Sequence, residues 1–325
     1  MKLRGIDFGN AIVGAGGLNF FGNGWWYHKI YKELFSGFNF TGSTFVAKTT
    51  TWEKRIGNMP LKKNLQPKEL KPSCILVYFF KAIILNSVGL AGPGAPVLFG
   101  MNKWQKITKP FFLSYTPSGE TKKDRLINLR LFVWLLKSYL PYFKAKIGLQ
   151  INVSCPNTEH SPAHSPAELS REVIEYLEIA SVLGIPSVVK FDYFTPIESI
   201  IEVANSEYCD AIECFNSFPV NKLSTAKLRE LFNRDESPLH HLGGGGMSGD
   251  ELLIPYTKKI QEIKKAGVIK PIIGGGGITD KIGVFLYKTV ADVDAIAFCS
   301  ATMTRPYNIR SIINMSNQLF GGADD

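Results

Sequence analysis

The chain has 325 residues, of which 45% are hydrophobic, so it can bury a large core and is neither disordered nor fibrous. Its five cysteines are odd in number and scattered, which argues against a small disulfide-rich secreted domain and favours a reducing compartment. The formal net charge of +9 fits nucleic acid, an acidic membrane surface or small anions equally well, so charge alone selects no partner.

Two segments bear on nucleic-acid and membrane binding. The most basic stretch, residues 54–71, has no interleaved aromatic residues for base stacking, so we interpret it as a solvated loop. The most apolar stretch, residues 74–80, ends at Lys81 and is much shorter than the roughly 20 residues of a membrane span. Near the N-terminus, Asp7 and Asn10 interrupt any signal-like segment. We therefore expect a cytoplasmic protein that binds neither membranes nor nucleic acid.

Apolar runs of strand length, rich in β-branched and aromatic residues, recur along the chain. In chain order they are residues 10–16, 43–49, 110–115, 146–154, 186–191, 210–215, 270–277 and 293–300. Most precede a segment with helical spacing of apolar residues. These predicted helices are residues 25–35, 123–140, 166–183, 196–206, 250–267, 280–290 and 306–320.

Strands that are apolar on both faces and alternate with amphipathic helices predict a parallel sheet covered by helices. Eight such units predict an α/β fold of the (β/α)8 TIM-barrel type, in a single domain of residues 1–325. A doubly wound sheet fits less well, because Asn19 stands where the last glycine of a G-x-G-x-x-G motif would be. Residues 50–109 and 216–249 predict long insertions at the C-terminal face, where barrels build their active sites.

Two glycine clusters, residues 243–249 and 274–278, each precede a predicted helix. Glycine lets the backbone approach a phosphate closely, and barrels commonly bind phosphate after their seventh and eighth strands. Residues 274–277 follow the seventh predicted strand and residues 299–302 follow the eighth. The two clusters together favour a phosphorylated cofactor, although either one alone fits a flexible turn equally well.

Polar side chains stand at strand ends or on the loops just beyond them. Lys48 and Lys190 each end an apolar run, at the end of the barrel that carries catalytic groups. Amide side chains can bind a flat ring with carbonyl and N–H edges, but any single one also fits a turn. The amides in such positions are Asn86, Asn152, Asn157 and Asn216.

Cys155 lies between serine and proline directly after a strand, which argues against a core position. A loop thiol, with a reference pKa of about 8.5, can act as a nucleophile or as a general base. His160 and His164 share this loop, but no clear catalytic partner emerges. The prolines between them preclude a regular helix and no third ligand is evident, so no metal site is expected.

Several of these segments together resemble the dihydroorotate dehydrogenases, in order and at appropriate spacings over nearly the whole chain. They are residues 48–58, 86–90, 152–157, the strand that carries Lys190, and residues 214–217, 243–249 and 274–278.

The resemblance implies a (β/α)8 barrel that holds FMN and oxidises dihydroorotate to orotate in pyrimidine biosynthesis. It also implies that Cys155 removes the C5 proton while hydride passes from C6 to flavin N5. Cysteine at this position and the lack of an N-terminal membrane helix resemble the cytosolic class 1 enzymes. Fumarate is then the expected electron acceptor and a homodimer the expected assembly.

The same resemblance assigns binding residues. Those implied for the orotate ring and its carboxylate are Asn86, Gly89, Leu90, Asn152, Asn157, Asn216 and Ser217. Those implied for the flavin are Ala15, Gly16, Lys48, Thr49, Asn152, Lys190, Gly246, Ser248 and Gly249. Its phosphate would lie on Gly276, Gly277, Ser300 and Ala301.

Residues 158–170 and 91–98 differ from the family pattern beside the expected substrate site. They leave open an FMN enzyme that acts on another dihydropyrimidine, or one that is linked to NAD through a partner subunit. A non-catalytic flavin-binding barrel belongs to a different class of function, and fold alone does not exclude it. Cys155, Lys190 and the asparagines argue against it, because a protein that only binds has no need of a base.

Overall fold

The computed structural model describes residues 1–153 and 165–321. One parallel sheet has the strand order β4-β3-β14-β13-β10-β9-β8-β7, and parallel bridges from Val46 to Phe112 and from Thr50 to Tyr115 join its two edges. The sheet therefore closes on itself, and the predicted (β/α)8 barrel is confirmed. Its strands are β3 (Ala11–Val13), β4 (Thr44–Phe45), β7 (Phe111–Tyr115), β8 (Ile147–Asn152), β9 (Ser187–Phe191), β10 (Ala211–Cys214), β13 (Ile272–Gly275) and β14 (Ala295–Phe298).

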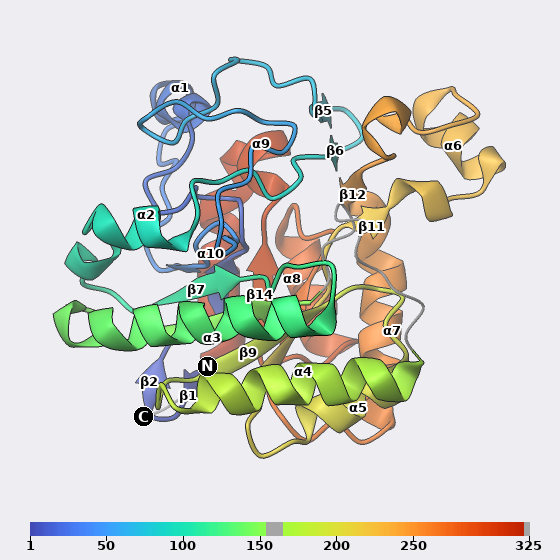
Figure 1. Ribbon diagram of the computed structural model, residues 1–325. Helices are drawn as coiled ribbons and strands as arrows, with labels where there is room; N and C mark the ends of the chain where they lie inside the picture. The colour runs from blue at the N-terminus through green and yellow to red at the C-terminus, as the bar shows by residue number, and fades with distance from the viewer. Residues whose placement is uncertain (154–164, 322–325) are drawn as a thin grey trace.

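Helices surround this barrel, and α3 and α4 lie side by side across the front of the view (Figure 1). The seven predicted helices are confirmed as α1 (Trp26–Leu34), α3 (Lys122–Tyr139), α4 (Pro166–Ser181), α5 (Ile197–Ala204), α7 (Leu253–Lys265), α8 (Lys281–Thr289) and α10 (Ile309–Phe320). The structure adds α2 (Ala95–Gly100), α6 (Thr225–Phe232) and α9 (Ala301–Thr304). Within residues 1–153 and 165–321, no helix combines the length and the apolarity that crossing a bilayer requires.

The two longest helices, α3 and α4, both begin at a capping box. The backbone N–H of Asp124 donates to Thr121 Oγ1 at 3.1 Å, and the Asp124 carboxylate accepts from the Thr121 backbone N–H. Ser165 and Glu168 repeat this arrangement at the start of α4. Each box gives partners to helix-end N–H groups that would otherwise lack them. The second box fixes the position at which the chain enters α4.

The two long insertions pair with each other at one end of the barrel. They form an antiparallel sheet of β5 (Ile75–Tyr78), β6 (Ile83–Asn86), β11 (Phe218–Pro219) and β12 (Gly246–Gly249). In Figure 1 this sheet lies in the upper part of the view, and the β1–β2 hairpin lies near the bottom. Gly249 has a φ of +126°, and a Cβ there would lie 1.9 Å from the Ala82 carbonyl oxygen. Part of the first glycine cluster is therefore a strand that packs tightly against another backbone.

The barrel interior is apolar at its N-terminal end. The hairpin of β1 (Lys2–Leu3) and β2 (Ile6–Asp7) brings Leu3 and Phe8 against inward-facing strand residues, including Ile12 and Val46. The rings of Phe8 and Phe112 stack with their centroids 4.1 Å apart. This packing closes the N-terminal end of the barrel with apolar side chains.

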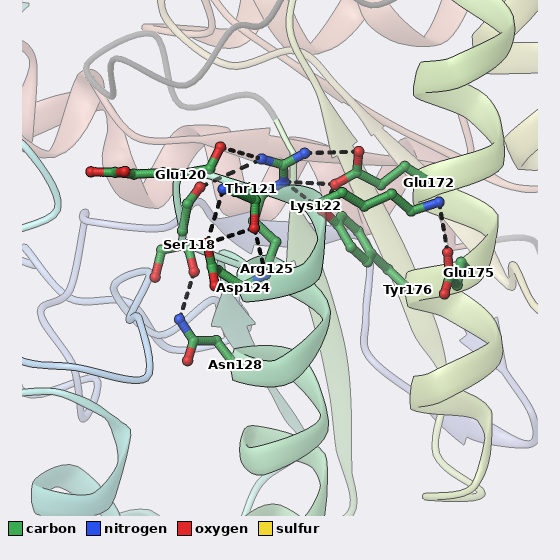
Figure 2. Close-up of polar contacts among 11 residues, drawn as sticks. Ser118, Glu120, Thr121, Lys122, Asp124, Arg125, Asn128, Glu172, Glu175 and Tyr176 are labelled. Atoms are coloured by element: carbon green, nitrogen blue, oxygen red, sulfur yellow. Dashed lines mark hydrogen bonds and ion pairs between the residues drawn. The ribbon is translucent and has the colours of Figure 1, made fainter.

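A buried ion pair joins α3 to α4 (Figure 2). The Arg125 guanidinium donates to both Glu172 oxygens, at 2.6 and 2.9 Å, and Tyr176 donates its hydroxyl to the same carboxylate. The hydrogen bond to Glu172 raises the pKa of Arg125 further above its ordinary value, and burial raises the pKa of Tyr176. Arg125 also contacts the carbonyls of Gly119 and Glu120, so the pair fixes the loop that follows β7.

Removing one partner of this pair should be costly, because the other charge stays buried. We expect Glu172→Gln to lower the free energy of unfolding by about 3–5 kcal/mol in urea titrations. The control is Asp235→Asn, which breaks an exposed ion pair with Arg229 and should leave the unfolding midpoint nearly unchanged. Equal shifts in the two variants would contradict the assigned importance of the buried pair.

Candidate active site at the carboxyl end of the barrel

A pocket of about 710 Å³ lies between the barrel mouth and the antiparallel sheet. Of the residues predicted to bind substrate, those that line it are Asn86, Gly89, Leu90, Asn152, Asn216 and Ser217. Cys155 and Asn157, with the histidines of the same loop, lie outside the described residues. The fold thus brings together six predicted residues from three separate segments of the chain, and their roles stay predictions.

Most of the residues predicted to bind the flavin line the same pocket. They are Ala15, Gly16, Lys48, Thr49, Asn152, Lys190, Ser248, Gly276, Gly277 and Ser300. Gly246 and Gly249 flank Ser248 in β12 without lining the pocket, and Ala301 follows Ser300. In the described part of the chain, no group of three or more His, Cys, Asp or Glu side chains is placed to hold a metal ion.

The asparagine amides reach the pocket from different strands. Asn86 ends β6 and donates to the Gly246 carbonyl at 3.3 Å, whereas Asn152 ends β8 and donates to Thr49 Oγ1 at 3.2 Å. Asn216 follows β10, and its backbone carbonyl oxygen accepts a hydrogen bond from the Tyr256 hydroxyl at 2.8 Å. These contacts fix where each residue meets the pocket.

Both predicted lysines are buried and have partners. Lys48 Nζ donates to the Ala91 carbonyl at 2.6 Å and lies 5.0 Å from the centroid of the Phe20 ring. Lys190 Nζ lies 2.7 Å from Glu213 Oε1, with 8% and 2% of the two side chains exposed. Buried charges need such partners, because desolvation otherwise disfavours them strongly. The pocket therefore holds two fixed positive charges.

Three buried polar residues inside the barrel were missed by the sequence analysis. Ser114 Oγ lies 2.9 Å from Thr49 Oγ1 and donates to Gln150 Oε1 at 2.9 Å. Gln150 in turn donates its amide N–H to the Glu213 carboxylate. The only signal in the sequence was a polar residue within each of three largely apolar strands. Together with Thr49 and Lys190, these residues form a continuous chain, which we call the polar belt.

The second glycine cluster forms a tight turn after β13. Gly276 and Gly277 have φ values of +108° and +75°, and a Cβ on Gly277 would lie 2.4 Å from the backbone nitrogen of Leu253. A Cβ on Gly276 would lie 2.3 Å from the Tyr256 ring. The turn therefore requires glycine and keeps bare backbone beside the pocket, a geometry that suits a phosphate group.

The start of α1 forms an uncharged aromatic wall of the pocket. Trp25 Nε1 donates to the Gly16 carbonyl at 2.7 Å, which ties this wall to the loop after β3. Burial lowers the pKa of His28 to about 4 and raises the pKa of Tyr27 well above its ordinary value. Both side chains are therefore neutral at pH 7, and this wall adds no charge to the site.

Cys299 follows β14 and opens onto the pocket. Desolvation by the surrounding walls raises the pKa of its thiol to about 11, while Lys190 lowers that pKa and Glu213 raises it. The Cys299 thiol is therefore protonated at neutral pH.

The family model for dihydroorotate dehydrogenase matches residues 1–285. The chain belongs to the dihydroorotate dehydrogenase family. This match confirms both the resemblance inferred from the sequence motifs and the predicted enzyme class, an oxidoreductase.

Curated relatives and a solved structure agree with the family assignment. The catalytic subunit of dihydroorotate dehydrogenase B (NAD(+)) from Listeria innocua is 24% identical over 94% of this chain and 88% of its own length. The catalytic subunit from Listeria monocytogenes is 23% identical over 97% of this chain and 90% of its own length. A ligand-free type dihydroorotate dehydrogenase from Eimeria tenella superposes with a TM-score of 0.65 at 17% identity, over 99% of this chain and 87% of that one. The last comparison supports the barrel fold.

The raised pKa of Cys299 predicts slow alkylation in this member of the dihydroorotate dehydrogenase family. Because the thiolate reacts, labelling by iodoacetamide at pH 8 should be roughly a hundredfold slower than for an ordinary thiol. The rate should then rise roughly tenfold per pH unit towards pH 11, as more thiol ionises. Peptide mass spectrometry measures the rate, and Cys299→Ser identifies the peptide. A rise of only about threefold between pH 8 and 9, as for a thiol with the ordinary pKa of about 8.5, would contradict the raised pKa.

Proposed function

We propose that this protein binds FMN and oxidises dihydroorotate to orotate in pyrimidine biosynthesis. The observation that carries the proposal is one pocket that gathers asparagine amides, two buried lysines and a glycine turn from distant segments. Membership of the dihydroorotate dehydrogenase family supports the same reaction. A barrel that only binds flavin would need neither this set of ring-binding amides nor a base.

The residues present fit FMN. The bare backbone of Gly276 and Gly277 suits its phosphate, with Ser300 and Ala301 on the neighbouring turn. Lys48 and Lys190 would contact the flavin ring, which the remaining pocket residues would enclose. These are Ala15, Gly16, Thr49, Asn152 and Ser248, with Gly246 and Gly249 in the supporting strand. When bound, FMN supplies the acceptor for the hydride that leaves C6 of the substrate.

The chain's own residues would bind the substrate and move its C5 proton. The amides of Asn86, Asn152 and Asn216 would hold the ring and donate hydrogen bonds to the oxygen on which charge develops. The further substrate contacts that we propose are Gly89, Leu90, Asn157 and Ser217. Cys155, three residues beyond the end of β8, would accept the proton on its sulfur. A C5 proton beside a carbonyl is only weakly acidic, so base and donors must act together.

For the electron acceptor, we infer NAD+ reached through a second subunit. The Listeria relatives are named as catalytic subunits of an NAD(+) enzyme, which supports this route over the fumarate expected from the sequence. The expected homodimer stays a prediction, because the structure describes a single chain.

Anaerobic addition of dihydroorotate should bleach the visible flavin absorbance of the purified protein. Cys155→Ala should keep its flavin but bleach roughly 10²–10⁴-fold more slowly, because positioned proton transfer contributes about that factor. Cys155→Ser should retain some activity with its optimum at higher pH, since a hydroxyl is a weaker acid than a thiol. Stopped-flow absorbance measures all three proteins.

A matched control is Cys209→Ala, which alters a buried cysteine that does not line the pocket and should leave the bleaching rate unchanged. Bound flavin that stays oxidised in the wild-type protein would mean a different substrate ring or a binding function. An unimpaired rate in Cys155→Ala would exclude Cys155 as the base.

The acceptor can be tested on the reduced chain alone. After reduction by dihydroorotate, mixing with either fumarate or NAD+ should return the flavin absorbance only slowly, because the route to NAD+ needs the second subunit. Rapid return with fumarate would instead support the acceptor expected from the sequence.

A further inference from the structure

Glu213 is the only acidic side chain among the described residues that line the pocket. It lies in β10 in direct register with Lys190 of β9, and both side chains point into the barrel towards its carboxyl end. Only 1% of Glu213 is exposed. A carboxylate buried to this degree beneath a ligand pocket is costly unless it is paired and hydrogen-bonded.

The polar belt fixes the Glu213 carboxylate in one orientation. Its Oε1 faces Lys190 Nζ at 2.7 Å, and its Oε2 accepts the amide N–H of Gln150. The Gln150 carbonyl oxygen is already occupied by the Ser114 hydroxyl, so the amide N–H must point at Glu213. Ser114 is held in turn by Thr49, which itself accepts from Asn152. Residues from β7, β8 and β10 thus set the position of the Lys190 ammonium group.

The charge on Glu213 acts electrostatically on groups inside the pocket. Across the barrel mouth, Cys299 senses both members of the pair, since Lys190 lowers the pKa of its thiol and Glu213 raises it. Any group in the pocket that gains or loses charge would respond in the same way, because both charges sit where water does not screen them well.

We propose that Glu213 is a positioning residue that fixes Lys190 at the flavin site and lowers the reduction potential of the bound flavin. This inference rests on the proposed function. Reduction adds negative charge to the flavin ring, which Lys190 stabilises and the Glu213 carboxylate opposes. The ion pair therefore holds the cation in place while offsetting much of its effect on the potential.

The test is a redox titration of the flavin-loaded protein with an indicator dye. Glu213→Gln keeps the size and polarity of the side chain and removes its charge. We expect the ratio of reduced to oxidised flavin at a fixed potential to rise at least tenfold, which is about 30 mV for a two-electron couple. The control is Glu172→Gln, which removes a buried carboxylate outside the pocket. Measured at a temperature well below its unfolding transition, this variant should change the ratio less than threefold.

If Glu213→Gln does not fold, a second variant can change the surroundings of the Glu213 carboxylate without removing it. Gln150→Met deletes the amide donor, leaves the Glu213 charge less neutralised and should lower the ratio at least threefold. An unchanged ratio in whichever variant folds would overturn the role of Glu213 while leaving the proposed function intact. A wild-type chain that binds no FMN would overturn the proposed function, and this inference with it.

Discussion

The pocket depends on the burial of charge at the mouth of a closed barrel. Lys190 and Glu213 are both removed from water, and their attraction offsets the cost of desolvation only while the remaining oxygen and amide groups also have partners. A closed barrel supplies those partners, because inward-facing residues of neighbouring strands meet at one level. The sealed, apolar lower half leaves the carboxyl end as the place where such groups can gather.

The barrel alone does not make the site. The antiparallel sheet built from the two insertions brings Asn86 and Ser248 over the barrel mouth, opposite Lys190 and Asn152. The start of α1 adds a neutral aromatic wall. Charge, amide donors and apolar surface thus enter the pocket from different directions, as a flat ligand with a polar ring and an anionic tail requires.

The barrel could be predicted because its strands are continuous apolar runs and its helices have clear spacing. The strands β5, β6, β11 and β12 were missed, because short and partly exposed strands that pair across distant insertions lack a local signal. Ser114, Gln150 and Glu213 were missed for a related reason. The role of one polar residue in an apolar strand depends on neighbours that are distant in the sequence. For the same reason, the residues of strand β12 were interpreted as part of a phosphate-binding loop.

The pairing of β6 with β12 joins two distant insertions into one structural unit. Asn86 and Gly246 stand 160 positions apart in sequence yet pair directly, within a register of four residue pairs. A shift of one residue in either strand would turn its side chains to the opposite face of the sheet. An insertion or deletion within one of these strands therefore requires a compensating change in the other. A chimaera that exchanges only one of the two segments between relatives would lose the antiparallel sheet that covers its pocket.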